Sequence, residues 1–298
     1  MKVSVSKWSK YKLMKQNKLL ADYLPETRIF KRDTLWSMLK RHKSVVIKPN
    51  FGRLGFKILK VNSLGDDHYN IHYGRKINHF TGQVPTLNYI NQITKKKRVV
   101  QQYIPLATID DAPFDFRIML QRKKRTDDWF VTGTAAKVSF SGYFVTNASV
   151  QVLTVEEAIN KSILKNKVKV TDLQKKLDSL GLEAARHLQK YFPKRTEIGL
   201  DVGIDEDGNL WIIEANYRPS INMFEIMQNQ TFYKNIVDFR SSPERYKERK
   251  TENTGKSESP GKNDLLPENK VTSNLNKNPD GNFITNLIRR FRRFLSSE

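Results

Sequence analysis

The chain has 298 residues, no cysteine and a formal net charge of +22. Its length allows one or two domains with a substantial core, and the absence of cysteine excludes disulfides, thiolate zinc sites and a cysteine nucleophile. No apolar run of about 18 residues is present to span a membrane, and the basic N-terminus lacks the apolar core of a signal peptide, so we expect a cytoplasmic protein.

The positive charge is concentrated at the start of the chain. Residues 1–60 hold 16 Lys and Arg residues against 3 acidic ones. Such a field attracts phosphates, nucleic acid or anionic lipid, although a solvated basic surface explains it equally well. The KKKR and RKKR runs raise the alternative of a nucleic-acid-binding module, but no recognised DNA or RNA motif accompanies them.

The first 105 residues predict helices followed by short strands. Residues 1–40 show a loose helical stripe that Pro25 interrupts, and a second helix is expected over Asp33–Arg41 with Asp33 as its N-cap. The short apolar runs that follow predict strands at Ser44–Lys48, Phe56–Val61 and Arg98–Ile104.

The next 135 or so residues mix strands and helices. Strands are predicted at Phe116–Arg122, Trp129–Ser139, Tyr143–Thr146, 198–205 and 209–215. Helices are predicted at Val155–Leu164, Thr171–Phe192 and Asn222–Gln228.

The end of the chain changes in composition. Residues 241–282 are rich in Ser, Asn, Lys, Glu, Pro and Gly, which is typical of a disordered linker. Residues 283–298 predict a basic amphipathic helix, with apolar side chains on one face and arginines on the other. Such a helix fits an anionic membrane or a protein partner, and packing on its own domain is an equal alternative.

The stretch from Ile198 to Pro219 predicts a β-hairpin, because Asp207-Gly208 is a strong two-residue turn signal. With these two residues as the loop, Glu206 faces Asn209 and Asp201 faces Glu214. Alternation along each strand then gives an apolar face made of Leu200, Val202, Ile204, Trp211, Ile213 and Ala215. The opposite face carries Gly199, Gly203, Asp201, Glu214 and Asn216.

The two opposed carboxylates indicate a metal site. Directly opposed side chains lie about 4.5–5.5 Å apart at Cβ, so two like charges repel there, and burial strengthens the repulsion. A divalent cation removes this conflict. Carboxylate and amide oxygens suit magnesium, which also takes substrate phosphates. We therefore predict Asp201, Glu214 and Asn216 as magnesium ligands, with a solvated acidic hairpin as the alternative.

A second candidate lies near the N-terminus. An apolar strand delivers Lys48, and a loop containing Gly52 and Gly55 follows it. Backbone N–H groups of such a loop can cradle phosphates, and a lysine on the strand can neutralise them. A lysine that simply ends a strand is the alternative.

The order of these parts resembles the ATP-grasp family: IKP with a glycine loop, VVQQYIP, DFR, and a final hairpin with Asp and Glu-x-Asn. The segments YLPET, VVQQYI, FDFR and IIEANYRPS are similar to its YheC/YheD branch, which is associated with the endospore coat. The resemblance covers about residues 5–228. It implies an α+β ATP-grasp fold, with ATP held between an N-lobe at 41–105 and a C-lobe at 106–240, after an N-terminal helical segment at 1–40.

The resemblance also implies roles for individual residues. Lys48 would contact the α- and β-phosphates, and Arg117, in the element that begins at Asp115, would face phosphate or acyl-phosphate oxygens, unless it is only a structural partner of Asp115. Lys137 and Asn147 lie where related ligases carry further active-site residues. The adenine hinge would consist of Gln101, Gln102, Tyr103 and Ile104.

The implied activity is that of an ADP-forming ligase that uses ATP and Mg²⁺. It would activate the carboxylate of a small molecule or peptide as an acyl phosphate and join it to an amine or thiol, in the cytoplasm or at the periphery of a membrane or the spore coat. A nucleotide-binding coat protein with weak catalysis is the alternative. Two departures from the family pattern favour it: Lys57 stands where a third glycine is common, and only about 40 residues stand where related ligases carry a full domain. The segment NASVQV also lacks the Gly-Gly pair of related peptide-modifying ligases.

Overall fold

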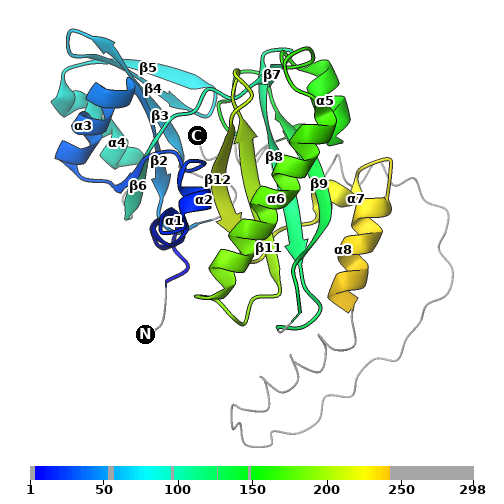
Figure 1. Cartoon of the computed structure of the whole chain (residues 1–298). Helices are drawn as coiled ribbons and strands as arrows, with labels where there is room; N and C mark the ends of the chain where they lie inside the picture. Colours follow the sequence, from blue (N-terminus) through cyan, green and yellow to red (C-terminus); the bar gives the residue numbers. More distant parts are fainter. Residues whose placement is uncertain (1–3, 53–56, 95–96, 126, 147–148, 242–298) are drawn as a thin grey trace, which may run out of the picture. The chain divides into compact units, whose positions relative to one another are not determined.

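Two antiparallel sheets with helices packed on them form the α+β fold that the sequence predicted (Figure 1). The structure is a computed structural model that describes residues 4–52, 57–94, 97–125, 127–146 and 149–241.

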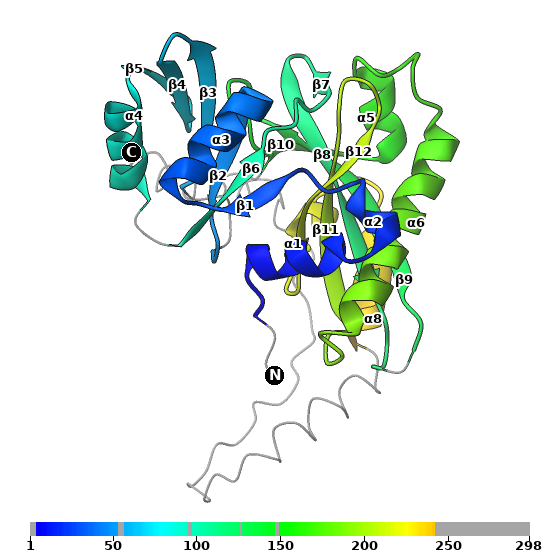
Figure 2. The ribbon, with the colours of Figure 1, turned by 60° about the vertical axis from the view of Figure 1, so that its left-hand side comes forward.

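The first sheet has the strand order β1-β6-β2-β3-β4-β5. Its strands are β1 (Thr27–Ile29), β2 (Ser44–Pro49), β3 (Leu59–Gly65), β4 (His68–Tyr73), β5 (Lys76–Thr81) and β6 (Arg98–Gln102). Helices α3 (Arg32–His42) and α4 (Gln83–Ile93) cover one face of this sheet (Figure 2). Their apolar side chains form a core with alternate residues of β2, such as Val45 and Ile47.

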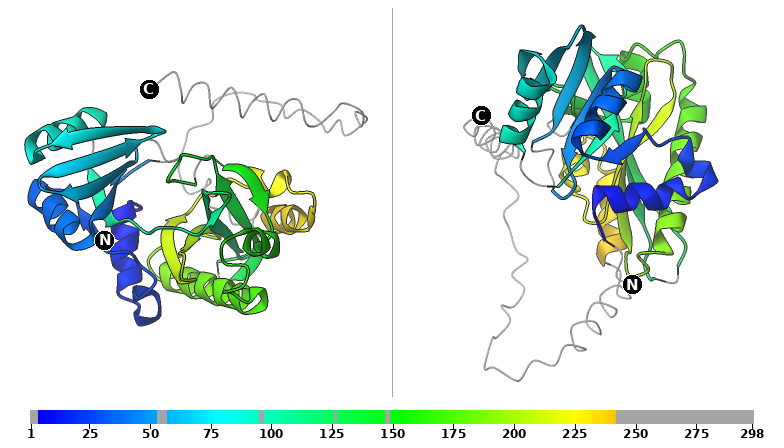
Figure 3. Two further views of the ribbon diagram at one scale, coloured as in Figure 1. Left: turned by 90° about the horizontal axis from the view of Figure 1, so that it is seen from above. Right: turned by 90° about the vertical axis from the view of Figure 1, so that its left-hand side faces the viewer.

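The second sheet has the order β10-β9-β8-β11-β12, and the short β7 pairs with β8. Its strands are β7 (Thr108–Ile109), β8 (Ala112–Gln121), β9 (Phe130–Ser139), β10 (Ser149–Leu153), β11 (Glu197–Ile204) and β12 (Leu210–Asn216). Helices α5 (Val155–Lys161) and α6 (Val170–Gln189) lie on one face, whereas α7 (Asn222–Glu225) and α8 (Thr231–Ser241) lie on the other (Figure 3).

The N-terminal segment forms α1 (Lys7–Lys15) and α2 (Lys18–Ala21). Ser6 caps α1 by accepting a 3.1 Å hydrogen bond from the backbone N–H of Ser9. Both helices contact α6, and α1 also contacts β12 (Figure 2). None of the helices in the described part of the chain combines the length and the apolar character needed to cross a bilayer.

Several predicted elements need correction. Residues 143–146 form an irregular, bent segment rather than a strand. Asp33 lies in the first turn of α3, and Lys31 is the N-cap residue. The predicted strand at Phe56–Val61 begins only at Leu59. After Pro25 the chain forms the short β1, because the backbone of this segment pairs with β6.

The tail lies almost entirely outside the described residues. Of the predicted linker at 241–282, only Ser241 is described, and it ends α8. The predicted amphipathic helix at 283–298 is also outside this range.

Candidate functional site

The β11–β12 hairpin places its two acidic residues opposite each other, which confirms the predicted pairing of Asp201 with Glu214. The predicted pairing of Glu206 with Asn209 is wrong. Ile204 pairs with Leu210 instead, and the carboxylate of Asp205 accepts hydrogen bonds from the turn. A carboxylate at the start of a turn stabilises a wider loop in this way.

A bulge in β12 reconciles the wider loop with the predicted pairing. Val202 pairs with Ile212 and Asp201 pairs with Glu214, so Ile213 is an extra residue on β12. An extra residue reverses which side chains face the core on one side of the bulge. Leu210 and Ile212 are therefore in the core, and the predicted core positions of Trp211 and Ile213 are wrong.

Alternation along the central strands of the second sheet separates the core from a charged face. In β8, Phe114, Phe116 and Ile118 enter the core under α6, and Asp115 and Arg117 lie between them in sequence. The same alternation in β9 and β11 places Lys137 and Asp201 on that opposite face. Asp115 pairs with Lys137, and Arg117 pairs with Asp201, so opposite charges lie across from each other.

The charged face is centred on the buried Asp201. Arg117 donates from Nε and one terminal nitrogen to its carboxylate, at 2.8 and 3.1 Å, and Lys137 Nζ lies 3.0 Å from Oδ1. Burial alone would raise the pKa of Asp201, but Arg117 and Lys137 hold it well below its usual range. Asp201 is therefore ionised at neutral pH.

Asp115 completes this cluster. Lys137 Nζ is 3.0 Å from Asp115 Oδ1, and the hydroxyl of Thr146 donates to Oδ2 at 2.5 Å. Burial raises the pKa of Asp115, although the charge of Lys137 opposes the rise. Lys137 thus joins two carboxylates that come from different strands.

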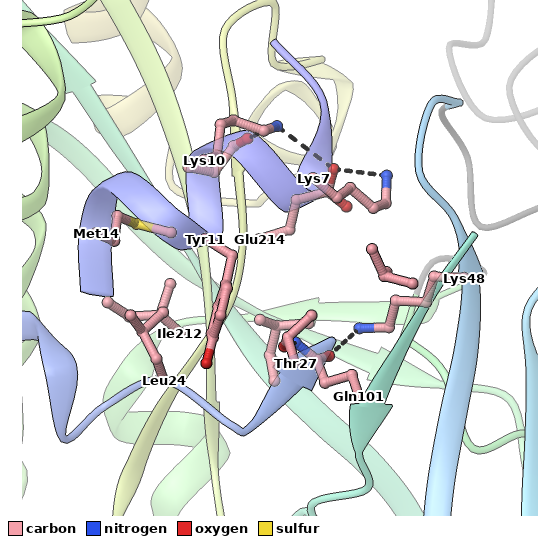
Figure 4. Close-up of a pocket in the computed structure, with 13 residues that line it drawn as sticks. Lys7, Lys10, Tyr11, Met14, Leu24, Thr27, Lys48, Gln101, Ile212 and Glu214 are labelled. Carbon is pink, nitrogen blue, oxygen red and sulfur yellow. Dashed lines mark hydrogen bonds and ion pairs between the residues drawn. The ribbon is translucent and has the colours of Figure 1, made fainter. Parts of the chain in front are cut away.

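Glu214 has two cationic neighbours that the sequence analysis missed. Lys7 Nζ donates to Glu214 Oε1 at 2.9 Å, and Lys10 Nζ lies 3.8 Å from the same oxygen (Figure 4). Lys10 also donates to the carbonyl oxygen of Ala215. Both lysines belong to α1, about 200 residues away along the chain, and no local pattern signals this contact.

Lys48 lies on the face of the first sheet opposite its core. Val45 and Ile47 are buried under the helices, so the intervening Val46 and the following Lys48 line a cavity. Lys48 Nζ donates to Gln101 Oε1 at 2.6 Å, and Gln101 Nε2 donates to the hydroxyl of Thr27 at 2.8 Å (Figure 4). Burial lowers the pKa of Lys48 to about 8, although Glu214 opposes the fall.

One cavity brings most of the predicted site residues together. Its empty volume is about 670 Å³, including space open to solvent. Its lining includes all four predicted hinge residues together with Lys48, Asp115, Asp201 and Glu214. Ile58, Leu106, Phe144, Val145 and Thr146 also line it and were not predicted.

Two predicted site residues, Gly55 and Asn147, lie outside the described residues. Gly52 is described and has a φ of +138°, a conformation that favours glycine. Its carbonyl oxygen accepts a 3.3 Å hydrogen bond from Lys7 Nζ.

Part of the basic RKKR run is structural. Arg122 is 2% exposed and donates to the backbone carbonyls of Pro193 and Arg195. This residue holds the end of β8 to the segment before β11, so it is not a surface cation available to nucleic acid.

Asp201, Glu214 and Asn216 supply the carboxylate and amide oxygens that magnesium prefers. Among the described residues, no three His, Cys, Asp or Glu side chains gather as a metal site. Asp201, Glu214 and the amide oxygen of Asn216 would therefore share the ion with phosphates and water, as is usual for Mg²⁺. Asn216 donates to Asp201 through Nδ2 at 3.1 Å, so this hydrogen bond does not use its amide oxygen.

Two curated proteins of Bacillus subtilis (strain 168) are similar to this chain. The endospore coat-associated protein YheC is 22% identical over 220 residues, which are 72% of this chain and 59% of that protein. The endospore coat-associated protein YheD is 26% identical over 233 residues, which are 75% of this chain and 50% of that protein. The chain thus spans between half and three-fifths of the length of these relatives.

Two solved structures are also similar. N5-carboxyaminoimidazole ribonucleotide synthetase from Thermotoga maritima is 12% identical with a TM-score of 0.43, covering 80% of this chain and 49% of that one. N5-carboxyaminoimidazole synthetase from Staphylococcus aureus, complexed with ADP, is 10% identical with a TM-score of 0.46, covering 78% of this chain and 50% of that one.

A family model described as YheC/D-like ATP-grasp matches residues 2–242. The match includes both sheets, the charged face and the hairpin that bears Asp201 and Glu214. The resemblance seen in the sequence motifs is thereby confirmed, and the chain belongs to the YheC/D-like ATP-grasp family.

Proposed function

We propose that the chain binds ATP with magnesium and uses them to ligate a carboxylate. The observation that carries this proposal is the balance of charge around the cavity. In the described part of the chain, Lys48 lines the cavity together with the carboxylates Asp115, Asp201 and Glu214. Lys7 and Lys10 line an adjoining pocket that shares Lys48 and Glu214 with it, and Arg117 and Lys137 form ion pairs with Asp201. Five cationic side chains thus accompany three carboxylates. A polyphosphate with its metal ion is the ligand whose charge fits this positive excess.

The site residues divide into those that hold phosphate and those that hold the metal. Lys48 and Arg117 would neutralise phosphate oxygens, while Lys137 would keep Asp115 and Asp201 in place. Asp201, Glu214 and Asn216 would hold the magnesium ion. When bound, that ion would offset negative charge on the phosphates.

The hinge has a different role. Tyr103 and Ile104 follow β6 and line the cavity, and the ammonium group of Lys60 lies 3.7 Å from the centroid of the Tyr103 ring. Because the side-chain oxygen of Gln101 accepts from Lys48, its predicted contact with adenine requires this hydrogen bond to change. We therefore assign adenine contact first to the stretch from Gln102 to Ile104.

The proposed reaction has two steps. A carboxylate oxygen of the substrate attacks the γ-phosphorus of ATP, the bond from that phosphorus to ADP breaks, and an acyl phosphate forms. An amine then attacks the acyl carbon, phosphate leaves with the bonding electrons, and the nitrogen loses a proton to give an amide. The side chains position the reactants and stabilise charge without forming a covalent bond.

The curated names of the relatives suggest a setting for this activity. YheC and YheD are called endospore coat-associated, so we propose a sporulation-related carboxylate, from a small molecule or a peptide, as the substrate. The amine is the favoured acceptor and a thiol is the alternative.

A substrate screen tests the proposal. The full chain is incubated with ATP, Mg²⁺ and pools of amino acids, short peptides and other carboxylates, and both ADP formation and product mass are measured. We expect at least one pool to give ADP together with a product that is heavier than the carboxylate substrate by the mass that the joined amine adds. The Glu214→Ala variant should lose turnover and keep its circular dichroism spectrum.

Two results would contradict the proposal. If folded Glu214→Ala protein still turns over ATP, Glu214 is not the magnesium ligand that we propose. ATP binding without ADP or product in any pool favours a nucleotide-binding coat protein that is not a ligase.

A further inference from the structure

The first turn of α1 connects the two ends of the site. Lys7 Nζ donates to Glu214 Oε1 at 2.9 Å (Figure 4), and it also donates to the carbonyl oxygen of Gly52 at 3.3 Å. Glu214 belongs to the carboxylate hairpin, and Gly52 begins the glycine loop. A single ammonium group therefore lies between the proposed metal ligand and the proposed phosphate loop.

The position of Lys7 is fixed by backbone contacts. Its own N–H donates to the carbonyl of Asn50 at 3.0 Å, and the N–H of Trp8 donates to Asn50 Oδ1 at 3.0 Å. Asn50 is buried and lies two residues before Gly52. The start of α1 is thus attached to the segment that leads into the glycine loop.

The other end of α1 is attached to the second sheet's helix layer. His187 of α6 donates from Nε2 to the carbonyl of Leu13 at 2.8 Å, and Asn17 Nδ2 donates to Glu183 Oε1 at 2.6 Å. Because both ends of the helix are held, Lys7 can change its side-chain partner while its backbone stays in place.

Charge determines which partner Lys7 has. Without a metal ion, Glu214 needs a cation, and Lys7 supplies it. A magnesium ion on Glu214 would take over this role and repel the ammonium group. The remaining carbonyl of Gly52 is a neutral acceptor, so an anionic oxygen beside the glycine loop would be the stronger partner.

Together these contacts lead to one inference, which rests on the proposed function. We propose that Lys7 is a nucleotide-binding residue: it neutralises Glu214 in the nucleotide-free protein and binds the terminal phosphate of ATP once magnesium occupies Glu214. Lys10 stays with the hairpin, because its ammonium group also donates to the carbonyl of Ala215.

The test uses Lys7→Met in the full chain, with Lys12→Met as the matched control. Lys12 is exposed on the same helix, and its ammonium group lies 5.9 Å from the Trp8 ring centroid. Binding of ATP and of ADP with Mg²⁺ is measured by calorimetry. Binding of Mn²⁺ without nucleotide is measured by electron paramagnetic resonance.

The two measurements should change in opposite directions. Lys7→Met should weaken ATP binding by about tenfold or more, as the loss of a charge-assisted hydrogen bond predicts. ADP binding should change much less, because ADP lacks the terminal phosphate. Mn²⁺ binding should become tighter, because the competing cation has gone. Lys12→Met should match the wild type, and Lys7→Arg should retain ATP affinity.

Other outcomes overturn the inference. If Lys7→Met binds ATP as the wild type does, or if its affinities for ATP, ADP and Mn²⁺ all fall together, Lys7 only supports the fold. If the wild-type chain does not bind ATP at all, the proposed function fails with it.

Discussion

Asp201 is the residue on which the charged face depends. It is 5% exposed, and it accepts hydrogen bonds from Arg117, Lys137 and Asn216. β-Sheet pairing places one of its neighbours, because Arg117 on β8 is directly opposite Asp201. Removing this carboxylate would leave two buried cations without their shared counter-charge.

Replacing this carboxylate should be costly. In Asp201→Asn the buried Arg117 and Lys137 lose a counter-charge, so we expect the free energy of unfolding to fall by about 3 kcal/mol. Glu214→Gln is the matched control, and its cost should stay below about 1 kcal/mol because that side chain and Lys7 are more exposed. Urea denaturation measures both. Equal costs for the two variants would argue against the central position of Asp201.

A second residue, Glu26, gives a pH-dependent prediction. Burial would raise its pKa, but hydrogen bonds from His42, Arg41 and Arg28 lower the pKa of Glu26 to about 2, against an ordinary value of 4.5. Because the pKa of Glu26 is lower in the folded state than its ordinary value of 4.5, the ionised side chain stabilises the fold at pH values above 4.5. This contribution is lost as the pH falls toward the folded-state pKa.

Glu26→Gln should therefore be less stable than the wild type at pH 6, and this difference should shrink steadily between about pH 4.5 and pH 2. Denaturation of both proteins across that range measures the difference. Glu206 is exposed, so Glu206→Gln is the control, and its free energy of unfolding should match that of the wild type at each pH. A difference that grows on acidification would contradict the assigned contacts.

At the scale of elements, the β11–β12 hairpin shows what sequence pattern can predict. The predicted pairing of Asp201 with Glu214 holds although the predicted two-residue loop does not, because the bulge in β12 offsets the wider turn. The prediction assumes strict alternation, so it could not detect the bulge at Ile213, and it misassigned Trp211 to the core. Long-range packing, rather than local pattern, decides where such an extra residue goes.

The first sheet shows a second limit. The short apolar run in SVVIKP predicted a strand that ends in Lys48. The strand β1 was missed because three residues after a proline give almost no periodic signal, and it exists through pairing with β6. Contacts made by α1 with Glu214 were missed for the same reason, since nothing near Lys7 in sequence indicates a partner in β12.

Gly199 in β11 provides a prediction at this scale. A Cβ atom at this position would lie 2.6 Å from Pro219 Cβ and 3.2 Å from Arg117 Cδ. Gly199→Ala should therefore displace Arg117 or the segment after β12, and overpacking of this kind costs about 1–3 kcal/mol. Thermal and urea unfolding measure the loss. If Gly199→Ala were as stable as the wild type, Pro219 and Arg117 would not approach residue 199 as closely as described.

For the whole molecule, the fold brings cations from distant segments to the carboxylates Asp115, Asp201 and Glu214, which line the cavity. Lys7 and Lys10 come from α1, Lys48 from the first sheet, and Arg117 and Lys137 from the second. The +13 balance of residues 1–60 predicted an attraction for phosphates without identifying the ligand. The role of residues 283–298 at a membrane or a partner stays a prediction, because they lie outside the described part of the chain.

Calorimetric titration of ATP into the folded full chain, with and without Mg²⁺, tests the central claim most directly. It is run in two buffers of different ionisation enthalpy, so that a small net heat is not mistaken for absence of binding. We predict saturable binding of a single ATP that weakens markedly when magnesium is omitted. No binding in either buffer, by protein whose circular dichroism shows it to be folded, would contradict the account.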